Sequence, residues 1–92
     1  MKYRIVKTTR YRKELKKMLK RGKDIKKIVD VVRMLANGET LPPQYHDHAL
    51  VNDLAGLRDC HIESDWILLY SIEDDVLVLT LTRTGAHSDL GL

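Results

Sequence analysis

The stretch Arg58-Asp59-Cys60-His61-Ile62-Glu63-Ser64-Asp65-Trp66-Ile67-Leu68-Leu69-Tyr70, residues 58–70, decides the fold. Its two apolar runs continue to either side as Leu57 to Glu63 and Trp66 to Ile72, and the short polar pair Ser64-Asp65 joins them, so they predict two successive strands. A third strand is predicted at Val76 to Thr84. Short turns between successive strands indicate an antiparallel meander. The middle run is apolar at both alternating positions, which favours a central strand covered on both faces.

The N-terminal part of the chain predicts a strand and two helices. The strand is Tyr3 to Thr8, and Thr8 or Thr9 offers a hydroxyl to cap the first helix, which Gly22 ends. Asp24 caps the second helix, and Asn37-Gly38 closes it. Its apolar stripe is Ile25, Ile28, Val29, Val32 and Leu35. We therefore expect one α+β domain over residues 1–92, with a β-α-α-β-β-β order and a helical hairpin packed on a mainly antiparallel sheet.

Positive charge is concentrated at the N-terminal end. Residues 1–33 carry 14 Lys and Arg against three Asp and Glu, whereas the remaining residues carry two Arg against ten Asp and Glu. Clustered cations favour a polyanionic partner such as a nucleic acid. The alternative interpretation is an ordinary solvated helix face. On the first interpretation, the lysines of the predicted first helix are candidate contacts with ribosomal RNA: Lys13, Lys16, Lys17 and Lys20.

The single cysteine, Cys60, excludes an intrachain disulfide and a thiolate-based metal site. This is typical of a reducing, cytosolic setting. The sequence also shows no apolar run long enough for a signal peptide or a membrane span. The prediction is a cytoplasmic protein with no membrane partner.

Polar groups suited to phosphate chemistry gather near the ends of the predicted strands. Alternation places Asp59, His61 and Glu63 on one face of their strand, opposite Cys60. Arg83 has the parity of the leucines in its strand and would point into an apolar face, unless it lies beyond the covered part or a bulge turns it. The long aperiodic segment from residue 39 to residue 55 is also a candidate functional loop.

Three blocks of sequence resemble the YafQ-type toxins of the RelE superfamily. They are Leu41-Pro42-Pro43 with Tyr45 and Asp47-His48-Ala49-Leu50, the stretch 58–70, and Arg83-Thr84-Gly85-Ala86-His87-Ser88. The resemblance implies a RelE-like fold and a bacterial type II toxin that cleaves messenger RNA on the translating ribosome and is neutralised by a cognate antitoxin. The family's catalytic set then falls on His48, His61, Asp65, Arg83 and His87.

One feature departs from that family. Its members commonly carry an aromatic residue near the C-terminus, whereas this chain has no Phe and ends Asp89-Leu90-Gly91-Leu92. If that residue stacks on a base, Trp66 or Tyr45 would have to supply the stacking here. Trp66 is therefore a candidate RNA contact, with a core position as the alternative.

Metal-independent cleavage of RNA through its own 2′-hydroxyl needs a base, an acid and a group that stabilises the phosphoryl oxygens. The expected roles are His87 as general acid, His48 or His61 as general base, Asp65 as the carboxylate that orients an imidazole, and Arg83 on the phosphate. For His61 a purely structural role is the alternative. No cofactor or metal is expected, although His46-Asp47-His48 admits a metal site with Asp65 or His61 as a further ligand.

Two other functions remain open from the sequence. A ParE-like member of the same superfamily would inhibit DNA gyrase by protein contact and would need no catalytic histidines. The other alternative is a non-catalytic RNA-binding module. The joint presence of His48, His61, Asp65 and His87 favours the nuclease.

Overall fold

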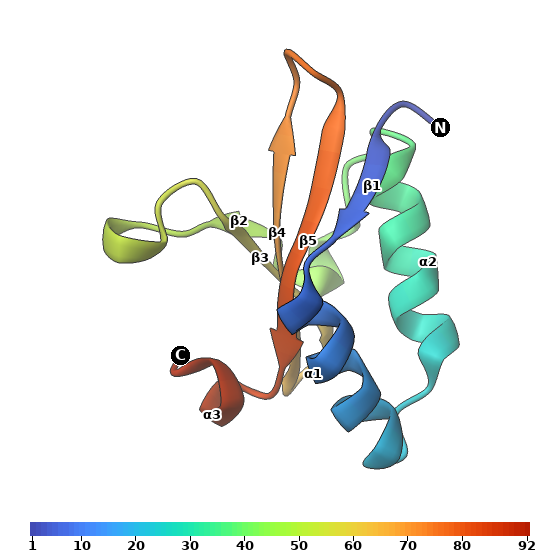
Figure 1. Cartoon of the computed structure of the whole chain (residues 1–92), viewed down its shortest axis with the longest axis vertical. Coiled ribbons are helices and arrows are strands. Elements are labelled where there is room, and N and C mark those ends of the chain that lie inside the picture. The colour runs from blue at the N-terminus through green and yellow to red at the C-terminus, as the bar shows by residue number, and fades with distance from the viewer.

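The computed structural model describes residues 1–92 and contains every strand and helix that the sequence predicts. Two short elements, β2 and α3, are additional. In chain order the elements are β1 Arg4–Lys7, α1 Thr9–Lys20, α2 Ile25–Ala36, β2 His48–Ala49, β3 Arg58–Glu63, β4 Trp66–Glu73, β5 Val78–Gly85 and α3 His87–Leu90, with the 3-10 turns η1 Pro43–Tyr45 and η2 Asn52–Leu54 (Figure 1). The predicted α+β class is confirmed.

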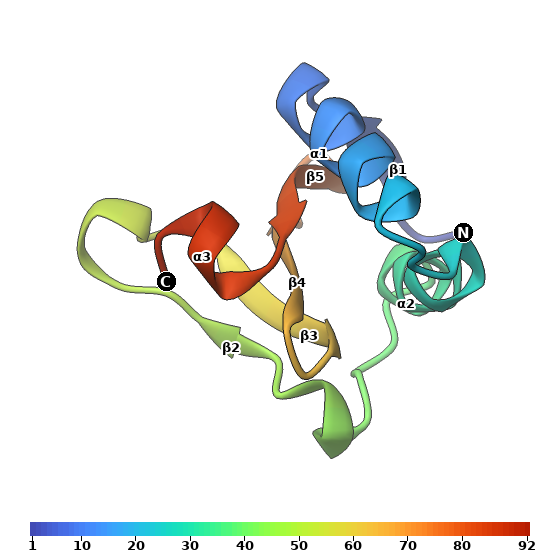
Figure 2. The ribbon, with the colours of Figure 1, turned by 90° about the horizontal axis from the view of Figure 1, so that it is seen from below.

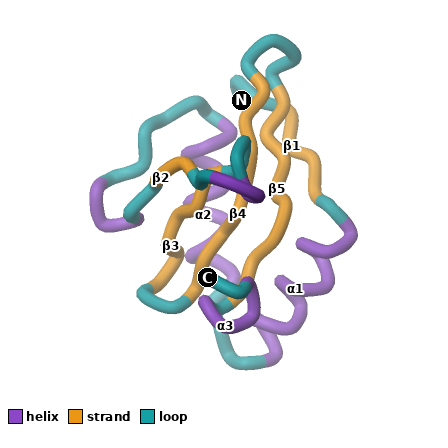
Figure 3. The backbone as a smooth tube through the Cα atoms, turned by 90° about the vertical axis from the view of Figure 1, so that its left-hand side faces the viewer, coloured by secondary structure: helices purple, strands orange, loops and turns teal.

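The five strands form one mixed sheet in the order β1-β5-β4-β3-β2 (Figure 3). β3, β4 and β5 make the predicted antiparallel meander, β2 is antiparallel to β3, and β1 is parallel to β5. The expected central position of the middle strand is confirmed, because the five residues Trp66–Tyr70 of β4 are at most 1 % exposed.

The two long helices begin and end where their capping residues predict. The Thr8 hydroxyl accepts a hydrogen bond from the backbone N–H of Tyr11, and the Asp24 carboxylate accepts one from that of Lys26, each at 2.9 Å. These bonds satisfy N–H groups that a helix leaves free at its first turn. Gly22, with φ of 92°, lies in the short connection, and α1 and α2 run in opposite directions (Figure 1).

One face of the sheet packs against both α1 and α2 and forms the main core (Figure 2). The predicted stripe of α2 needs correction at two positions, because Ile25, which is 49 % exposed, lines the same open groove as Val29 and is not part of the core. Val31 is fully buried, whereas Val29 is 41 % exposed, because α2 is turned so that Val29 borders an open apolar groove of about 310 Å³ between α1, α2 and β1. Side chains of the main core include Tyr11, Met18, Ile28, Leu35, Trp66, Leu68, Tyr70, Leu79 and Leu81.

The opposite face of the sheet is covered only in part, by α3 and by the segment around β2 (Figure 2). There Leu90 of α3 packs on Ile67 and Leu69 of β4 in a small apolar cluster. This second face carries the candidate site. None of the helices has the length and apolar character needed to cross a membrane.

Candidate active site

Pairing across four strands places the functional side chains on the second face of the sheet. His48 of β2 lies opposite Asp59 of β3, Asp59 lies opposite Leu69 of β4, and Leu69 lies opposite Arg83 of β5. His61 is two residues beyond Asp59, so both point to the same side. The predicted shared face of Asp59 and His61 is therefore confirmed.

The expectation that Glu63 shares this face is wrong. The register shifts between His61 and Glu63, so that Glu63 lies opposite Trp66, a residue of the main core. Its carboxylate accepts hydrogen bonds from Lys23 at 2.8 Å and from Lys27 at 2.7 Å on the side of the helices. These two bonds hold the pKa of Glu63 below its usual value.

A second register shift decides the direction of Arg83. In the pairing of β4 with β5, Tyr70 lies opposite Leu81 and Leu69 lies opposite Arg83, which leaves Thr82 as an extra residue in β5. One extra residue reverses the alternation of the strand. Leu81 therefore faces the main core, whereas Arg83 faces the same side as Asp59, as the bulge alternative expects.

All four histidines of the chain gather at this face. The ring centroids of His46 and His61 are 5.5 Å apart, and those of His61 and His87 are 5.3 Å apart. His46, His48 and His61 line an open cleft of about 760 Å³ that extends toward α2. The structure thus brings together the three predicted catalytic histidines and adds His46, which sequence reasoning considered only as a metal ligand.

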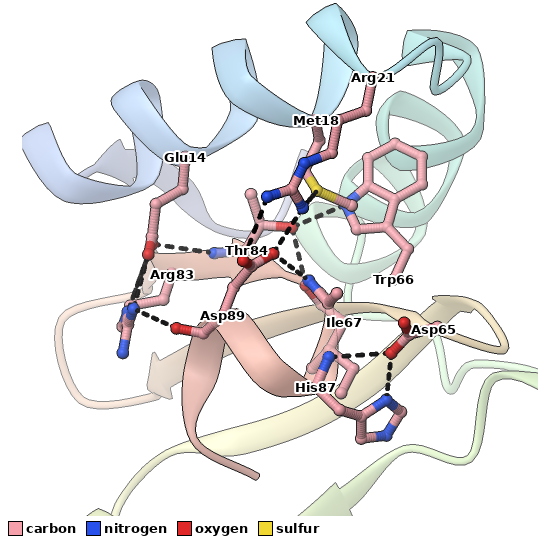
Figure 4. Close-up of polar contacts among 11 residues, drawn as sticks. Glu14, Met18, Arg21, Asp65, Trp66, Ile67, Arg83, Thr84, His87 and Asp89 are labelled. Carbon is pink, nitrogen blue, oxygen red and sulfur yellow. Dashed lines mark hydrogen bonds and ion pairs between the residues drawn. The ribbon is translucent and has the colours of Figure 1, made fainter.

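Asp65 fixes the ring of His87. One carboxylate oxygen, Oδ1, accepts hydrogen bonds from the backbone N–H of His87 at 2.9 Å and from its Nδ1 at 2.5 Å (Figure 4). The backbone bond and then the ring bond hold the pKa of Asp65 below its usual value. Because Nδ1–H donates to the carboxylate, Nε2 is the nitrogen left free to give a proton to a substrate.

His48 is held in a defined tautomer by the backbone. Its Nδ1 lies 2.7 Å from the carbonyl oxygen of His46, and a carbonyl only accepts, so this nitrogen carries a proton. In the neutral ring the lone pair is then on Nε2. His46 itself adopts a left-handed conformation, with φ of 48°, at the end of η1. That turn supplies the carbonyl that orients His48.

Asp47 anchors the segment that carries His46 and His48. Its carboxylate accepts hydrogen bonds from the Tyr70 hydroxyl at 2.5 Å and from the Arg58 guanidinium at 3.2 and 3.3 Å. Sequence reasoning missed this role, because it depends on contacts between residues that lie 11 and 23 positions apart.

The guanidinium of Arg83 is engaged away from the histidines. Its Nε and Nη2 donate to the carboxylate of Glu14 on α1, with Nη2 only 2.6 Å from Oε2, and Nη2 also lies 3.3 Å from the carbonyl of Asp89 (Figure 4). Arg83 borders a separate cavity of about 220 Å³. Sequence reasoning gave no signal for Glu14 as its partner.

Trp66 does not offer a surface to RNA, so its prediction as an RNA contact is wrong. It is fully buried, and its indole N–H donates to the Thr84 hydroxyl at 2.9 Å, which in turn donates to the carbonyl of Ile67 at 2.7 Å. The core alternative holds. The predicted RNA-binding lysines Lys13, Lys16, Lys17 and Lys20 are all exposed on α1.

The positions of the histidine and carboxylate side chains do not define a metal site. No group of three or more His, Cys, Asp or Glu side chains converges closely enough to hold an ion. The arrangement instead offers separate imidazoles, two of which, His48 and His87, are held by a hydrogen bond at Nδ1. Such an arrangement suits proton transfer.

The family described as the bacterial toxin of type II toxin–antitoxin systems, YafQ, matches this chain over residues 3–91. The chain belongs to the YafQ family. A curated relative, the mRNA interferase toxin YafQ of Escherichia coli strain K12, is 41 % identical over 81 residues, which cover 87 % of this chain and 86 % of the relative.

Solved YafQ-family structures share the fold. The E. coli DinJ–YafQ complex contains a chain that is 37 % identical with a TM-score of 0.88, covering 96 % of this chain and 97 % of that one. A metal-bound toxin from Helicobacter pylori is 38 % identical with a TM-score of 0.89, covering 98 % and 99 %. The resemblance to YafQ-type toxins that the sequence blocks indicate is therefore confirmed.

Proposed function

We propose that this YafQ-family toxin is an mRNA endoribonuclease that acts on translating ribosomes in the cytoplasm, by metal-independent acid–base catalysis. The observation that carries the mechanism is the pair of imidazoles held in fixed tautomers. His48 Nδ1 is bound to a carbonyl and His87 Nδ1 is bound to a carboxylate, so in each ring Nε2 is the nitrogen left free for proton transfer. The ring of His61 is next to those of both His46 and His87.

In the proposed reaction His48 or His61 takes the proton of the 2′-hydroxyl. The 2′-oxygen then bonds to the neighbouring phosphorus, and the bond from phosphorus to the 5′-oxygen breaks. His87 gives the proton on its Nε2 to the leaving 5′-oxygen. The products are a 2′,3′-cyclic phosphate and a 5′-hydroxyl end. Asp65 keeps the imidazolium of His87 in position and stabilises its charge.

The role of Arg83 on the phosphate requires a change of partner. Its guanidinium is on the correct face of the sheet, but Glu14 occupies it with hydrogen bonds from two nitrogens. A phosphate would have to replace the carboxylate, which has similar geometry for a bidentate guanidinium. In the free protein Arg83 therefore acts first as a link between β5 and α1.

The proposed partners are a cognate antitoxin, the ribosome and its messenger RNA. The solved complex of a YafQ with DinJ supports an antitoxin as partner. The exposed lysines of α1 support contact with ribosomal RNA, because phosphate backbones attract clustered cations. Binding to ribosomes should therefore weaken steeply as the salt concentration rises.

The test is expression of the chain without an antitoxin, followed by mapping of messenger RNA 5′ ends. We expect new ends in translated transcripts for the natural chain and for Ser88→Ala, an exposed neighbour in α3 that serves as control. His87→Ala should remove these ends while keeping the fold. Growth arrest by His87→Ala equal to that of the natural chain would contradict the assignment.

The same experiment distinguishes the nuclease from the two alternative functions. Arrest of DNA replication with intact transcripts would support a gyrase inhibitor, and binding of RNA without new ends would support a binding module. In vitro, cleavage of ribosome-bound message should continue in excess chelator. Cleavage that survives excess chelator would rule out a required metal ion.

A further inference from the structure

His46 is the one histidine of the site to which the proposed mechanism gives no role. Its ring lines the open cleft of about 760 Å³ together with those of His48 and His61, and its centroid lies 5.5 Å from that of His61. The residue is exposed, so a large ligand can reach the ring. A strand of RNA that places its 2′-hydroxyl at His48 or His61 therefore passes close to His46.

The ring of His46 differs from the other three imidazoles because it has no acidic partner. Each of the others has a nitrogen within 4.0 Å of a carboxylate oxygen of Asp59 or Asp65. Neither ring nitrogen of His46 makes a hydrogen bond or an ion pair. An imidazole carries at least one N–H whether it is neutral or charged. His46 therefore has a hydrogen-bond donor available for a ligand.

The wall of the cleft on the side of α2 favours an anionic ligand. Two carboxylates line the cleft, those of Asp30 and Glu63, and each accepts hydrogen bonds from two basic side chains. These basic partners are Lys23, Lys26, Lys27 and Arg33. Because four cations surround two carboxylates, this wall carries net positive charge, which attracts a phosphate backbone.

The backbone of His46 already serves the site. The residue ends η1 in a left-handed conformation, with φ of 48°, and its carbonyl oxygen lies 2.7 Å from Nδ1 of His48. Few residues other than Gly adopt this conformation, and Asn and His are among those that do. One residue thus orients His48 with its carbonyl and offers its own ring to the same cleft.

We propose that His46 forms a phosphate subsite beside the catalytic imidazoles, in which its ring donates a hydrogen bond to one of the two phosphodiesters that flank the scissile one. This inference rests on the proposed nuclease function and adds a substrate contact to it. His46 takes no part in the proton transfers, which belong to His48 or His61 and to His87. Its contact holds the strand in the cleft, so its loss should weaken binding and spare the chemical step.

The first measurement is single-turnover cleavage of ribosome-bound message by His46→Gly, over a range of toxin concentrations. Gly removes the ring but suits the left-handed backbone and keeps the carbonyl that orients His48. We expect the half-saturating concentration to rise about fivefold, as for one exposed charge-assisted contact, and the maximal rate to change by less than about twofold. His46→Asn repeats the measurement with a side chain that also tolerates this conformation, in case Gly loosens the turn.

Messages with one neutral methylphosphonate supply the second measurement. The substitution is placed in turn on either side of the cleavage position. At one of the two positions it should raise the half-saturating concentration of the natural chain about fivefold, because a methylphosphonate is a weaker acceptor without charge. The same substitution should add little in His46→Gly, since the contact is already lost. His46→Lys, which keeps a donor, should bind better than His46→Gly and remain sensitive.

Arg4→Gln is the matched control. It removes one exposed positive charge from β1, which is at the opposite edge of the sheet from β2. This variant should respond to each methylphosphonate as the natural chain does. Equilibrium binding to ribosomes that carry message with a 2′-deoxynucleotide at the cleavage position repeats every comparison without cleavage, because the attacking hydroxyl is absent.

Equal half-saturating concentrations for His46→Gly and the natural chain would overturn the proposal. So would a loss of affinity in His46→Gly that leaves the response to both methylphosphonates unchanged, because that pattern indicates stacking on a base or a structural role. A lower maximal rate with unchanged affinity would place His46 in the chemical step instead. If the natural chain leaves message intact, the nuclease function itself fails, whereas the binding comparison still decides the contact with phosphate.

Discussion

Two regions on the second face of the sheet each combine a carboxylate with imidazoles, but the carboxylate is exposed in one region and buried in the other. In the Asp65–His87 region the carboxylate is exposed and contacts the ring directly at 2.5 Å. In the Asp59 region the carboxylate is buried, and the nearest imidazole nitrogens are 3.5 and 4.0 Å away. Hydrogen bonds lower the pKa of Asp65, whereas burial raises that of Asp59.

This difference supports the proposed assignment of His87 as the general acid and of His48 or His61 as the general base. A carboxylate in direct contact stabilises an imidazolium, which suits the general acid, His87. Around Asp59 the rings are closer to the cleft and less tightly paired, which suits a neutral base. Environments that separate otherwise identical groups are a general means of assigning acid and base roles. Each prediction below tests one side of this comparison.

The largest effect is expected from removal of both candidate bases. His48→Ala with His61→Ala should lower the cleavage rate by about 10²- to 10⁴-fold, because no imidazole then remains beside Asp59. Each single variant should lose less, since the other ring stays. Single-turnover cleavage of ribosome-bound message measures all three. If either single variant matches the double, only that ring is the base.

Asp65→Asn tests the acid side. The amide cannot stabilise the imidazolium of His87, so the descending alkaline limb of the pH–rate profile should move to lower pH. The rate at the optimum should fall by about tenfold, less than the loss in His87→Ala. Ser64→Ala, the exposed neighbour in the same turn, is the control. An acidic limb that moves instead would reverse the assignment of the two regions.

The two regions also differ in how far the sequence predicts them. Alternation in β3 places Asp59 and His61 on one face without any knowledge of the fold. The same rule fails at Glu63 and cannot decide Arg83, because both lie next to register shifts. A bulge depends on how two strands pair, which a single strand does not encode.

Other parts of the site depend on contacts distant in sequence. The short strand β2 has two residues, too few for a periodic pattern, although it carries His48. The backbone turn at His46 and the anchoring of Asp47 appear only when the loop packs on β3 and β4. Trp66 follows Asp65 in the sequence and could therefore border the site, but in the structure its side chain is buried in the core.

The ion pair between Arg83 and Glu14 links the part of the site near His87 to α1, and Glu14→Gln tests this link. Glu14 and Arg83 have side chains that are 18 % and 20 % exposed, so the amide leaves a largely buried guanidinium with a weaker partner. We expect a loss of about 1–3 kcal/mol in the free energy of unfolding. Asp30→Asn, which breaks the more exposed pair with Lys26, should cost less than about 1 kcal/mol. Denaturant unfolding compares the two variants, and equal losses would show that the Glu14 pair has no special role.

The smallest effect is expected at the cap of α3, the helix that carries His87. Asp89 accepts hydrogen bonds from Arg21 at 2.6 Å and from the backbone N–H of Ala86 at 2.9 Å, and these lower the pKa of Asp89 to about 2. A lowered pKa in the folded state means that the ionised carboxylate stabilises the fold above the ordinary pKa of 3.8. That contribution is lost as the pH falls from about 4 toward 2.

Asp89→Asn should therefore be less stable than the natural chain at pH 7 by under about 1 kcal/mol, and the two should converge near pH 2. Arg21→Gln should reproduce part of the loss, and the double variant should lose less than the sum of the singles, because the two residues share one ion pair. Denaturant unfolding across this pH range measures the difference. A constant difference at every pH would show that the carboxylate charge does not hold α3. The acid side would then depend on the bonds between Asp65 and His87 alone.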